Sequence, residues 1–265
     1  METLQPSILA VGDFQRPDFR AAWSSFASLA GIAYADDSTQ AAAMLADGSI
    51  LPDLIVVAQA YPGQISPAAI NTLRRSAPLA RVVGLLGSWC EGELRSGRPW
   101  PGATRIYWHQ WPARWQRELD HFARGECPTW GLPLTASEDD RLLLETPSLP
   151  TSPRQGLIAI DAQRQMAQWL AAACQAEGYE TLWVRPAQAV QSQGAVAAIF
   201  DDADGRGIPR QRLSELAAAT PTVALLSFPR REDIDRAEAA GAKVVLSKPL
   251  LLADLSWALD RATQG

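Results

Sequence analysis

The sequence predicts an α/β protein of two domains, each a doubly wound parallel sheet of five strands. Short apolar runs recur along the 265 residues without polar alternation, which is typical of strands buried on both faces. Segments with apolar residues at helical spacing separate these runs, and this favours crossover connections and a parallel sheet. The whole pattern occurs twice, on either side of a segment rich in proline, serine and acidic residues.

The first predicted domain spans residues 1–125. A helix is expected between Phe19 and Leu29, where apolar residues recur three or four positions apart. Pro112 begins a last helix, because proline is tolerated at the first helical position, and Trp115 lies on the apolar face of that helix. The five strands are expected at 7–11, 32–35, 54–57, 81–86 and 105–108.

Residues 126–154 form the predicted linker. Proline removes a backbone donor and disfavours helix in the residue before it, so this segment should be extended. A connection of roughly 30 residues is also long for the inside of one compact domain, which supports a boundary here.

The second predicted domain, residues 155–265, repeats the order of the first. Its helices are expected around 166–174, 210–219 and 232–240, and a closing helix places Leu252, Leu255 and Leu259 on one face. The five strands are expected at 156–161, 181–184, 195–200, 222–226 and 243–246.

Composition bounds the function. A hydrophobic content of 47%, a charged content of 20% and a net charge of −5 describe a folded chain with no electrostatic reason to bind nucleic acid. The start has no basic region and its apolar run is short, so we expect a cytoplasmic protein without a membrane partner. Cys90, Cys127 and Cys174 are far apart and odd in number, which predicts reduced thiols rather than disulfides or a metal site.

The stretch at 241–249, GAKVVLSKP, carries a resemblance to a known family. It reads as a buried strand that ends in Lys248-Pro249 and leads into a helix. This resembles the last strand of response-regulator receiver domains and implies a flavodoxin-like, receiver-type fold. In that family an acidic pair follows strand one and a phosphoacceptor aspartate follows strand three. A Thr or Ser follows strand four, and a Lys-Pro pair follows strand five. The resemblance also implies that the Lys248–Pro249 peptide bond is cis.

In the second domain the resemblance assigns most of a phosphate pocket. Asp161 stands at the first acid, Ala162 replaces the second acid, Asp201 matches the phosphoacceptor and Lys248 matches the basic residue. No cofactor is expected. Asp161 and Asp201 would bind Mg²⁺ only if the domain accepts phosphate, because carboxylates are the ligands that this cation prefers. The structural alternative is that Lys248 only forms an ion pair with Asp161 or Asp201.

Two positions of this pocket stay open. The alignment places Leu226 at the hydroxyl position, although Ser227 would take that place if the register slips by one residue. Asp202 and Asp204 are candidates to replace the missing metal ligand, but both follow the end of the strand.

The first domain departs further and is predicted to be a pseudo-receiver. Gly12-Asp13 keeps only the second acid, Ala58 occupies the phosphoacceptor position, Leu86 replaces the hydroxyl, and His109-Gln110 replaces Lys-Pro. Without a carboxylate there is no nucleophile for acyl phosphate formation. His109 is expected to be a strand-end residue, since no partner ligand accompanies it at a useful spacing.

Tryptophan is concentrated in one segment, where Trp89, Trp100 and Trp111 are candidates for a partner interface. The alternative is that they pack against the linker or the second domain. Trp115 repeats with the apolar face of its helix and is expected in the core.

These observations favour a non-enzymatic signalling or scaffold protein of tandem receiver-like domains that acts through protein contacts, without phosphorylation. The partner would be a signalling protein, a histidine kinase or another regulator, and a homodimer is an alternative. The competing hypothesis is a two-component response regulator phosphorylated on Asp201 with Mg²⁺. A third class, a flavodoxin-like enzyme or nucleotide binder, lacks the expected glycine-rich loop after the first strand of either domain.

Overall fold

The computed structural model describes residues 5–27, 29–93, 100–133, 135–136, 140, 143–144, 154–185, 192, 194–202 and 210–264. The chain divides into two compact units, Met1–Leu144 and Glu145–Gly265, and the division falls inside the predicted linker. Among the helices of the described residues, none combines the length and the apolarity that a membrane span needs.

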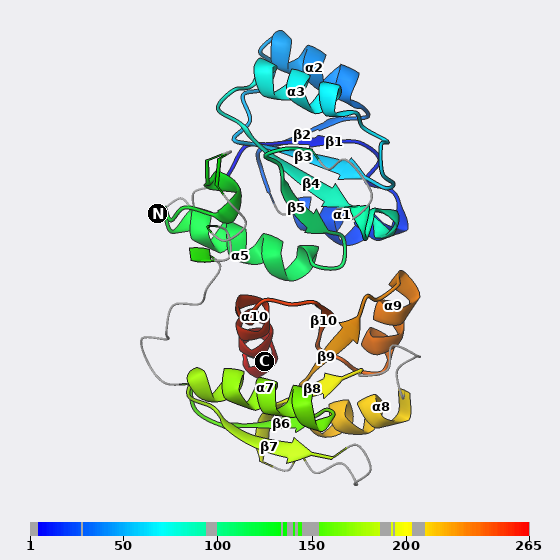
Figure 1. The fold of residues 1–265 in the computed structure, drawn as a ribbon, viewed down its shortest axis with the longest axis vertical. Coiled ribbons are helices and arrows are strands. Elements are labelled where there is room, and N and C mark those ends of the chain that lie inside the picture. The colour runs from blue at the N-terminus through cyan, green and yellow to red at the C-terminus, as the bar shows by residue number, and fades with distance from the viewer. Residues whose placement is uncertain are drawn as a thin grey trace. The chain divides into compact units, whose positions relative to one another are not determined.

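The first unit contains a five-stranded parallel sheet in the order β2-β1-β3-β4-β5. Its strands are β1 (Ile8–Val11), β2 (Ile32–Ala35), β3 (Leu54–Gln59), β4 (Arg81–Leu86) and β5 (Thr104–Tyr107). Its helices are α1 (Arg20–Phe26), α2 (Ser38–Ala46), α3 (Pro67–Ser76) and α5 (Trp111–Ala123), with short 3-10 turns η1 (Pro17–Phe19), η2 (Ser88–Cys90) and η3 (Thr129–Gly131). Helices α2 and α3 cover one face of this sheet, and α1 and α5 lie on the other (Figure 1).

The second unit repeats this architecture with the order β10-β9-β8-β6-β7. Its strands are β6 (Leu157–Asp161), β7 (Glu180–Val184), β8 (Ala195–Asp201), β9 (Thr222–Ser227) and β10 (Val244–Lys248). Its helices are α7 (Arg164–Ala176), α8 (Arg210–Ala219), α9 (Arg231–Ala239) and α10 (Leu252–Thr263). In both sheets the first strand lies between the second and the third, so the prediction of two doubly wound, receiver-type domains is confirmed.

The apolar runs that predict the strands are buried on both faces. In the first sheet, Leu9, Ile55 and Val57 belong to a buried cluster that also contains residues of α2 and α3. The other face carries an aromatic cluster. Trp111 and Trp115 stack with ring centroids 4.6 Å apart, and Phe26 meets both edge-on. Trp115 therefore lies in the core, as predicted.

The described residues at the start of the predicted linker pack on the first domain. The buried Glu118 of α5 accepts a hydrogen bond from the backbone N–H of Thr129 at 2.7 Å and another from its hydroxyl. Trp130 lies beside Phe122, with ring centroids 5.5 Å apart. The first domain thus continues past residue 125 to at least η3, because a buried carboxylate and an indole hold the chain there. Residues 145–153 lie outside the described part of the chain.

Candidate functional site

The ammonium of Lys248 and the carboxylate of Asp201 form the centre of the candidate site. The Nζ atom lies 2.6 Å from Oδ1, and the exposed fractions of the two side chains are only 15% and 2%. Each residue is the last of its strand, and parallel strands bring their carboxyl ends to one edge of the sheet. The Lys248–Pro249 peptide bond is cis, as the resemblance implies.

A serine hydroxyl lies beside this pair. Ser227 is the register partner of Lys248 in the pairing of β9 with β10. Its Oγ lies 3.4 Å from the carbonyl oxygen of Asp202, and Lys248 Nζ donates to the same oxygen at 3.2 Å. The placement of Leu226 at the hydroxyl position is therefore wrong by one residue. Strand β9 extends to Ser227, and the alternation of side chains turns the buried Leu226 to the opposite face.

The contacts described for Asp202 in the site are made by its backbone. Its N–H donates to the carbonyl oxygen of Leu225 at 2.9 Å, which holds the residue at the end of β8. Its own carbonyl oxygen is then the acceptor that Ser227 and Lys248 share. Whether the Asp202 side chain replaces the missing acid stays a prediction, and Asp204 lies outside the described residues.

Asp161 is paired with an arginine that the sequence analysis did not single out. Its Oδ2 lies 2.6 Å from Nε of Arg212, and the exposed fraction of the Asp161 side chain is 3%. Burial raises the pKa of Asp161, and the guanidinium of Arg212 acts in the opposite direction. A second nitrogen of Arg212 donates to the carbonyl oxygen of Arg185 at 2.9 Å.

Asp161 and Asp201 do not fit Mg²⁺ as their side chains stand. Asp161 and Asp201 each contact a cationic side chain, and the buried Ala162 supplies no carboxylate at the second acid position. Mg²⁺ requires near-octahedral oxygen coordination and is bound through carboxylates free to approach it. Within the part of the chain that is described, no group of three or more His, Cys, Asp or Glu is arranged to hold a metal ion.

The first domain has a matching set of positions at its own sheet edge. Gln59, the last residue of β3, pairs with Leu86, and Leu86 pairs with Tyr107. In the second domain Asp201 pairs with Leu225, and Leu225 pairs with Leu246. The register therefore matches Gln59 with Asp201. In the second domain the strands continue to Ser227 and Lys248, whereas β4 and β5 end at Leu86 and Tyr107. By residue count alone, Ser88 corresponds to Ser227 and His109 to Lys248.

This register corrects two assignments in the first domain. The phosphoacceptor position belongs to Gln59 rather than Ala58. By residue count the hydroxyl position falls on Ser88 rather than Leu86, and Ser88 lies in η2 with its hydroxyl donating to Asp18 Oδ2 at 3.0 Å. The strand β3 is two residues longer than its apolar run indicates, so counting from that run falls short. The carboxamide of Gln59 is still no nucleophile for phosphoryl transfer, and the pseudo-receiver assignment stays a prediction.

Side chains of the first domain fill its own sheet edge. The buried Gln59 donates through Nε2 to Glu93 Oε1 at 3.4 Å, and Arg105 pairs with the other oxygen of Glu93 at 2.7 Å. Burial raises the pKa of the neighbouring Cys90 thiol to about 11. His109 is buried with Nε2 3.2 Å from Glu91 Oε1, which agrees with a strand-end residue that is held by its surroundings.

Of the three tryptophans proposed for an interface, only Trp89 is exposed, with 76% of its surface free. Trp100 donates through its indole N–H to the carbonyl oxygen of Ile65 at 3.0 Å, and Trp111 donates to Ser25 Oγ at 3.1 Å. Both are buried in their own domain, so their assignment to an interface is wrong. The sequence shows where aromatic residues are concentrated, whereas their burial depends on which helix face meets the sheet.

The second domain also exposes an aromatic residue at the position that matches Trp89. Phe228 follows Ser227 as Trp89 follows Ser88, and 65% of its surface is exposed. Its φ of 44° is uncommon for a bulky side chain. Both domains therefore present an aromatic ring directly after a serine at or just past the end of the fourth strand.

Comparisons with known proteins found no matching family model and no matching curated protein. Solved structures similar to this chain include the signal receiver domain of a modulated diguanylate cyclase from Desulfovibrio desulfuricans G20, with 20% identity, 42% of this chain and 95% of that chain covered, and a TM-score of 0.34. A response regulator receiver domain protein from Clostridium thermocellum shows 20% identity over 42% of this chain and 94% of its own, with a TM-score of 0.34. A structure described as a two-component system response regulator/GGDEF domain protein shows 14% identity over 98% of this chain and 100% of its own, with a TM-score of 0.35. At these identities the likeness concerns the fold, and each domain has the strand order of a receiver domain.

Proposed function

We propose that this chain is a non-enzymatic signalling or scaffold protein whose tandem receiver-like domains act through protein contacts, independently of phosphorylation. The observation that carries the proposal is the ion pair between Arg212 and Asp161. In the receiver reaction a bound cation offsets the negative charge of the carboxylates and of the incoming phosphoryl group. Here the guanidinium of Arg212 already neutralises Asp161, which is the one carboxylate present at the two acid positions.

The free energy of this pair opposes its displacement. Asp161 is almost fully buried, and removing the partner of a buried charge costs about 3–5 kcal/mol. To bind here, Mg²⁺ would have to offset both the free energy of breaking this ion pair and the cost of its own dehydration. Only a few carboxylate ligands would be there to do so. The proposal therefore assigns Arg212 a structural role in place of a metal ion.

Protein contact is supported by the exposed aromatic residues at matched positions of the two domains. Trp89 and Phe228 are largely exposed and directly follow Ser88 and Ser227. Large exposed aromatic side chains are typical anchors of protein interfaces. The partner we propose is another signalling protein of the cytoplasm, such as a histidine kinase or a regulator.

Incubation with acetyl phosphate and Mg²⁺, followed by intact-mass measurement, tests the proposal. We expect no phosphoryl adduct on the wild-type chain and the same spectrum for Asp201→Asn. A phosphorylatable receiver treated in parallel controls for the donor. A stable adduct on the wild-type chain that disappears in Asp201→Asn would overturn the proposal.

Phosphorylation of Asp201 is a second candidate function, which the contacts of Lys248 and Ser227 favour. Lys248 Nζ lies 2.6 Å from the carboxylate, and the Ser227 hydroxyl lies beside it at the matched strand position. A cation and a hydroxyl are groups that stabilise a phosphoryl oxygen. This candidate predicts an adduct that both Asp201→Asn and Lys248→Ala reduce, whereas the first predicts no adduct to reduce.

A further inference from the structure

We propose that the cavity between α7 and the edge strand β7 of the second domain binds a free nucleotide, with its base between Trp183 and α7 and its phosphate on Arg164. The cavity has a volume of about 600 Å³ and is lined by Arg164, Ala167, Gln168, Ala171, Trp183 and Arg185. That volume lies within the usual range for small-molecule sites. None of these residues takes part in the Asp201 and Lys248 pair, so the inference is independent of the proposed function.

The indole of Trp183 is held in place. Its Nε1–H donates to the carbonyl oxygen of Ala162 at 2.9 Å, which fixes the ring beside the start of α7. The exposed fraction of the residue is 38%, so much of the ring remains accessible. A fixed aromatic face is a surface on which a planar base can stack, and stacking of this kind tolerates any base.

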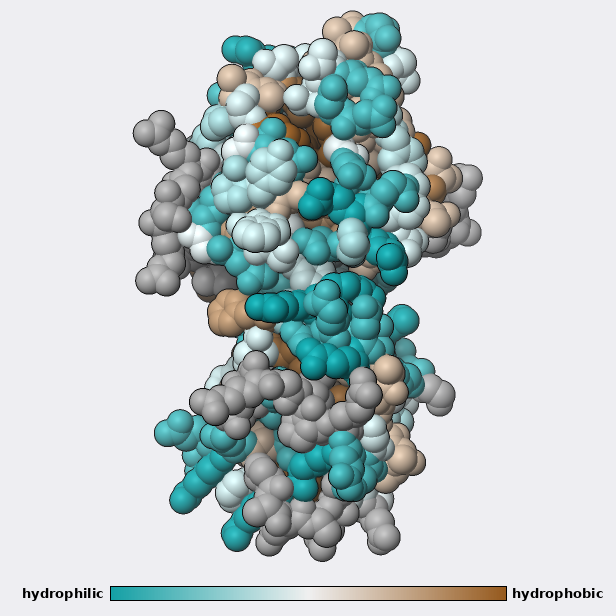
Figure 2. Space-filling view, turned by 90° about the vertical axis from the view of Figure 1, so that its right-hand side faces the viewer, coloured by the Kyte–Doolittle hydropathy of each residue, from teal (hydrophilic) through white to brown (hydrophobic). Residues whose placement is uncertain are grey.

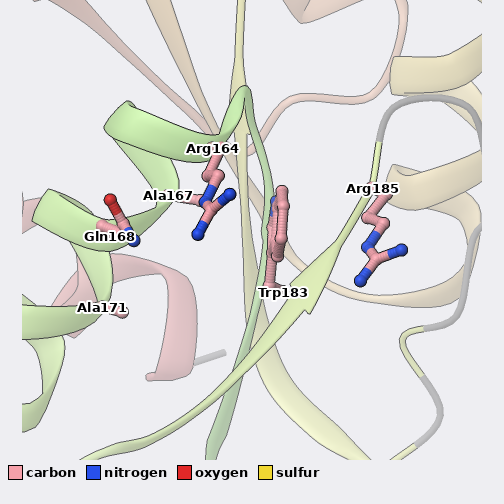
Figure 3. A pocket seen from close by; sticks show the side chains of 6 residues that line it. All are labelled: Arg164, Ala167, Gln168, Ala171, Trp183 and Arg185. Carbon is pink, nitrogen blue, oxygen red and sulfur yellow. The ribbon is translucent and has the colours of Figure 1, made fainter.

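Small residues leave room in front of this ring. Ala167 and Ala171 are one helical turn apart on α7 and line the cavity together with Trp183. Figure 3 shows the indole edge-on, with the α7 side chains to one side of it and Arg185 to the other. The alanine methyl groups and the indole thus provide two apolar walls for a flat ring.

The charge of the cavity selects an anion. Of the six described residues that line it, two are arginines and none is acidic, although the whole chain carries a net charge of −5. Among the described residues neither Arg164 nor Arg185 forms an ion pair, and the guanidinium of Arg185 lies 5.2 Å from the centre of the Trp183 ring. Guanidinium groups match phosphate in geometry and charge.

The backbone positions both cations. Arg164 is the first residue of α7, whose amino end carries the positive pole of the helix dipole. The carbonyl oxygen of Arg185 accepts a hydrogen bond from Arg212 at 2.9 Å, which anchors the chain just after β7. The cavity therefore offers a stacking face and a cation together, and a nucleotide supplies a matching ring and anion.

Calorimetric titration of the full chain with GMP, guanosine, inorganic phosphate and a short single-stranded oligonucleotide tests the proposal. We expect saturable binding of GMP and at least tenfold weaker binding of guanosine and of phosphate, because each offers only part of the ligand. Equal binding of phosphate, or tighter binding of the oligonucleotide, would mean a simple anion site or a nucleic-acid site and would overturn the proposal.

Variants locate the site. Arg164→Gln should weaken GMP binding about tenfold or more, since it removes a charge-assisted contact. Arg261→Gln is the matched control, because Arg261 also lies over a tryptophan, Trp257, at 5.8 Å but lines no part of this cavity. Trp183→Phe keeps a stacking face if Trp183→Ala fails to fold. Absence of GMP binding to the wild type, or equal loss in Arg261→Gln, contradicts the assignment.

Discussion

Ser227 and Lys248 are direct partners in the parallel register of β9 and β10, and their side chains meet at one acceptor, the carbonyl oxygen of Asp202. One edge of the sheet therefore brings a hydroxyl and a cation together. At the same edge Asp161 contacts the guanidinium of Arg212, and the neighbouring Ala162 has no carboxylate. Both carboxylates, Asp161 and Asp201, thus contact cationic side chains.

Loss of Lys248 should destabilise the second domain. Lys248→Ala leaves the buried carboxylate of Asp201 without its cation, and we expect the free energy of unfolding to fall by about 3 kcal/mol. Urea denaturation followed by circular dichroism measures it. The double variant Asp201→Ala/Lys248→Ala should recover much of the loss, because no buried charge remains. Equal losses of unfolding free energy in the single and the double variant would contradict this explanation, because the unpaired charge would then not be the cause.

Removal of the arginine should create sensitivity to Mg²⁺. In Arg212→Ala the carboxylate of Asp161 loses its neutralising partner and becomes available to a divalent cation. We expect added Mg²⁺ to raise the melting temperature of this variant and to leave that of the wild type unchanged. Arg231→Ala, which removes an arginine paired with Asp235 elsewhere in the domain, is the control. If Mg²⁺ raises the melting temperature of the wild type as much as that of Arg212→Ala, the result would support a native metal site.

The exposed and the buried tryptophan of the first domain should respond differently to truncation. Trp89→Ala removes an exposed side chain, and its effect on the free energy of unfolding should stay within about 0.5 kcal/mol. Trp111→Ala opens a cavity in the aromatic cluster and should cost about 3–5 kcal/mol. If Trp89 anchors a partner, Trp89→Ala weakens that complex in a pull-down while the domain remains folded. Comparable destabilisation by both changes would contradict the burial described above.

Cysteine reactivity should separate one thiol from the other two. Cys127 is exposed, whereas Cys90 and Cys174 are buried. Burial raises the pKa of the Cys90 thiol to about 11 and that of Cys174 to about 12. The thiolate is the reactive form, so iodoacetamide at pH 8 should label Cys127 alone in the native chain and all three cysteines in urea, as peptide mass spectrometry would show. Rapid native labelling of Cys174 would indicate that the second core opens readily.

The same two thiols should make stability fall in alkaline solution. An unfolded thiol ionises near its ordinary value of 9.0, whereas the folded thiols hold their protons to about pH 11 or 12. Through that range the folded state binds more protons than the unfolded state, so the free energy of unfolding decreases as pH rises. Denaturation midpoints compared between pH 8 and 10 check the sign. Cys174→Ala should reduce the slope.

Much of the fold and part of the site follow from local sequence. Continuous apolar runs and helical spacing locate the ten strands that pair in the two sheets, and the Lys248-Pro249 pair identifies the basic corner of the pocket. The errors lie at strand ends. Strands β3, β8, β9 and β10 each extend beyond their apolar runs, to Gln59, Asp201, Ser227 and Lys248. A polar residue at the end of a strand is not recognised from an apolar run. The sequence therefore assigns Leu226 and Ala58 to positions that belong to their neighbours.

The sequence alone therefore determined two parallel α/β domains and the absence of a carboxylate at the end of the third strand of the first, because periodicity and residue type are local properties. Only the tertiary structure decided that Arg212 reaches Asp161, that Ser227 lies beside Lys248 and that Trp111 is buried. Each of these depends on the register between strands distant in sequence or on which face of a helix meets the sheet. Those relationships are set by packing across the whole domain, and no short window of residues contains them.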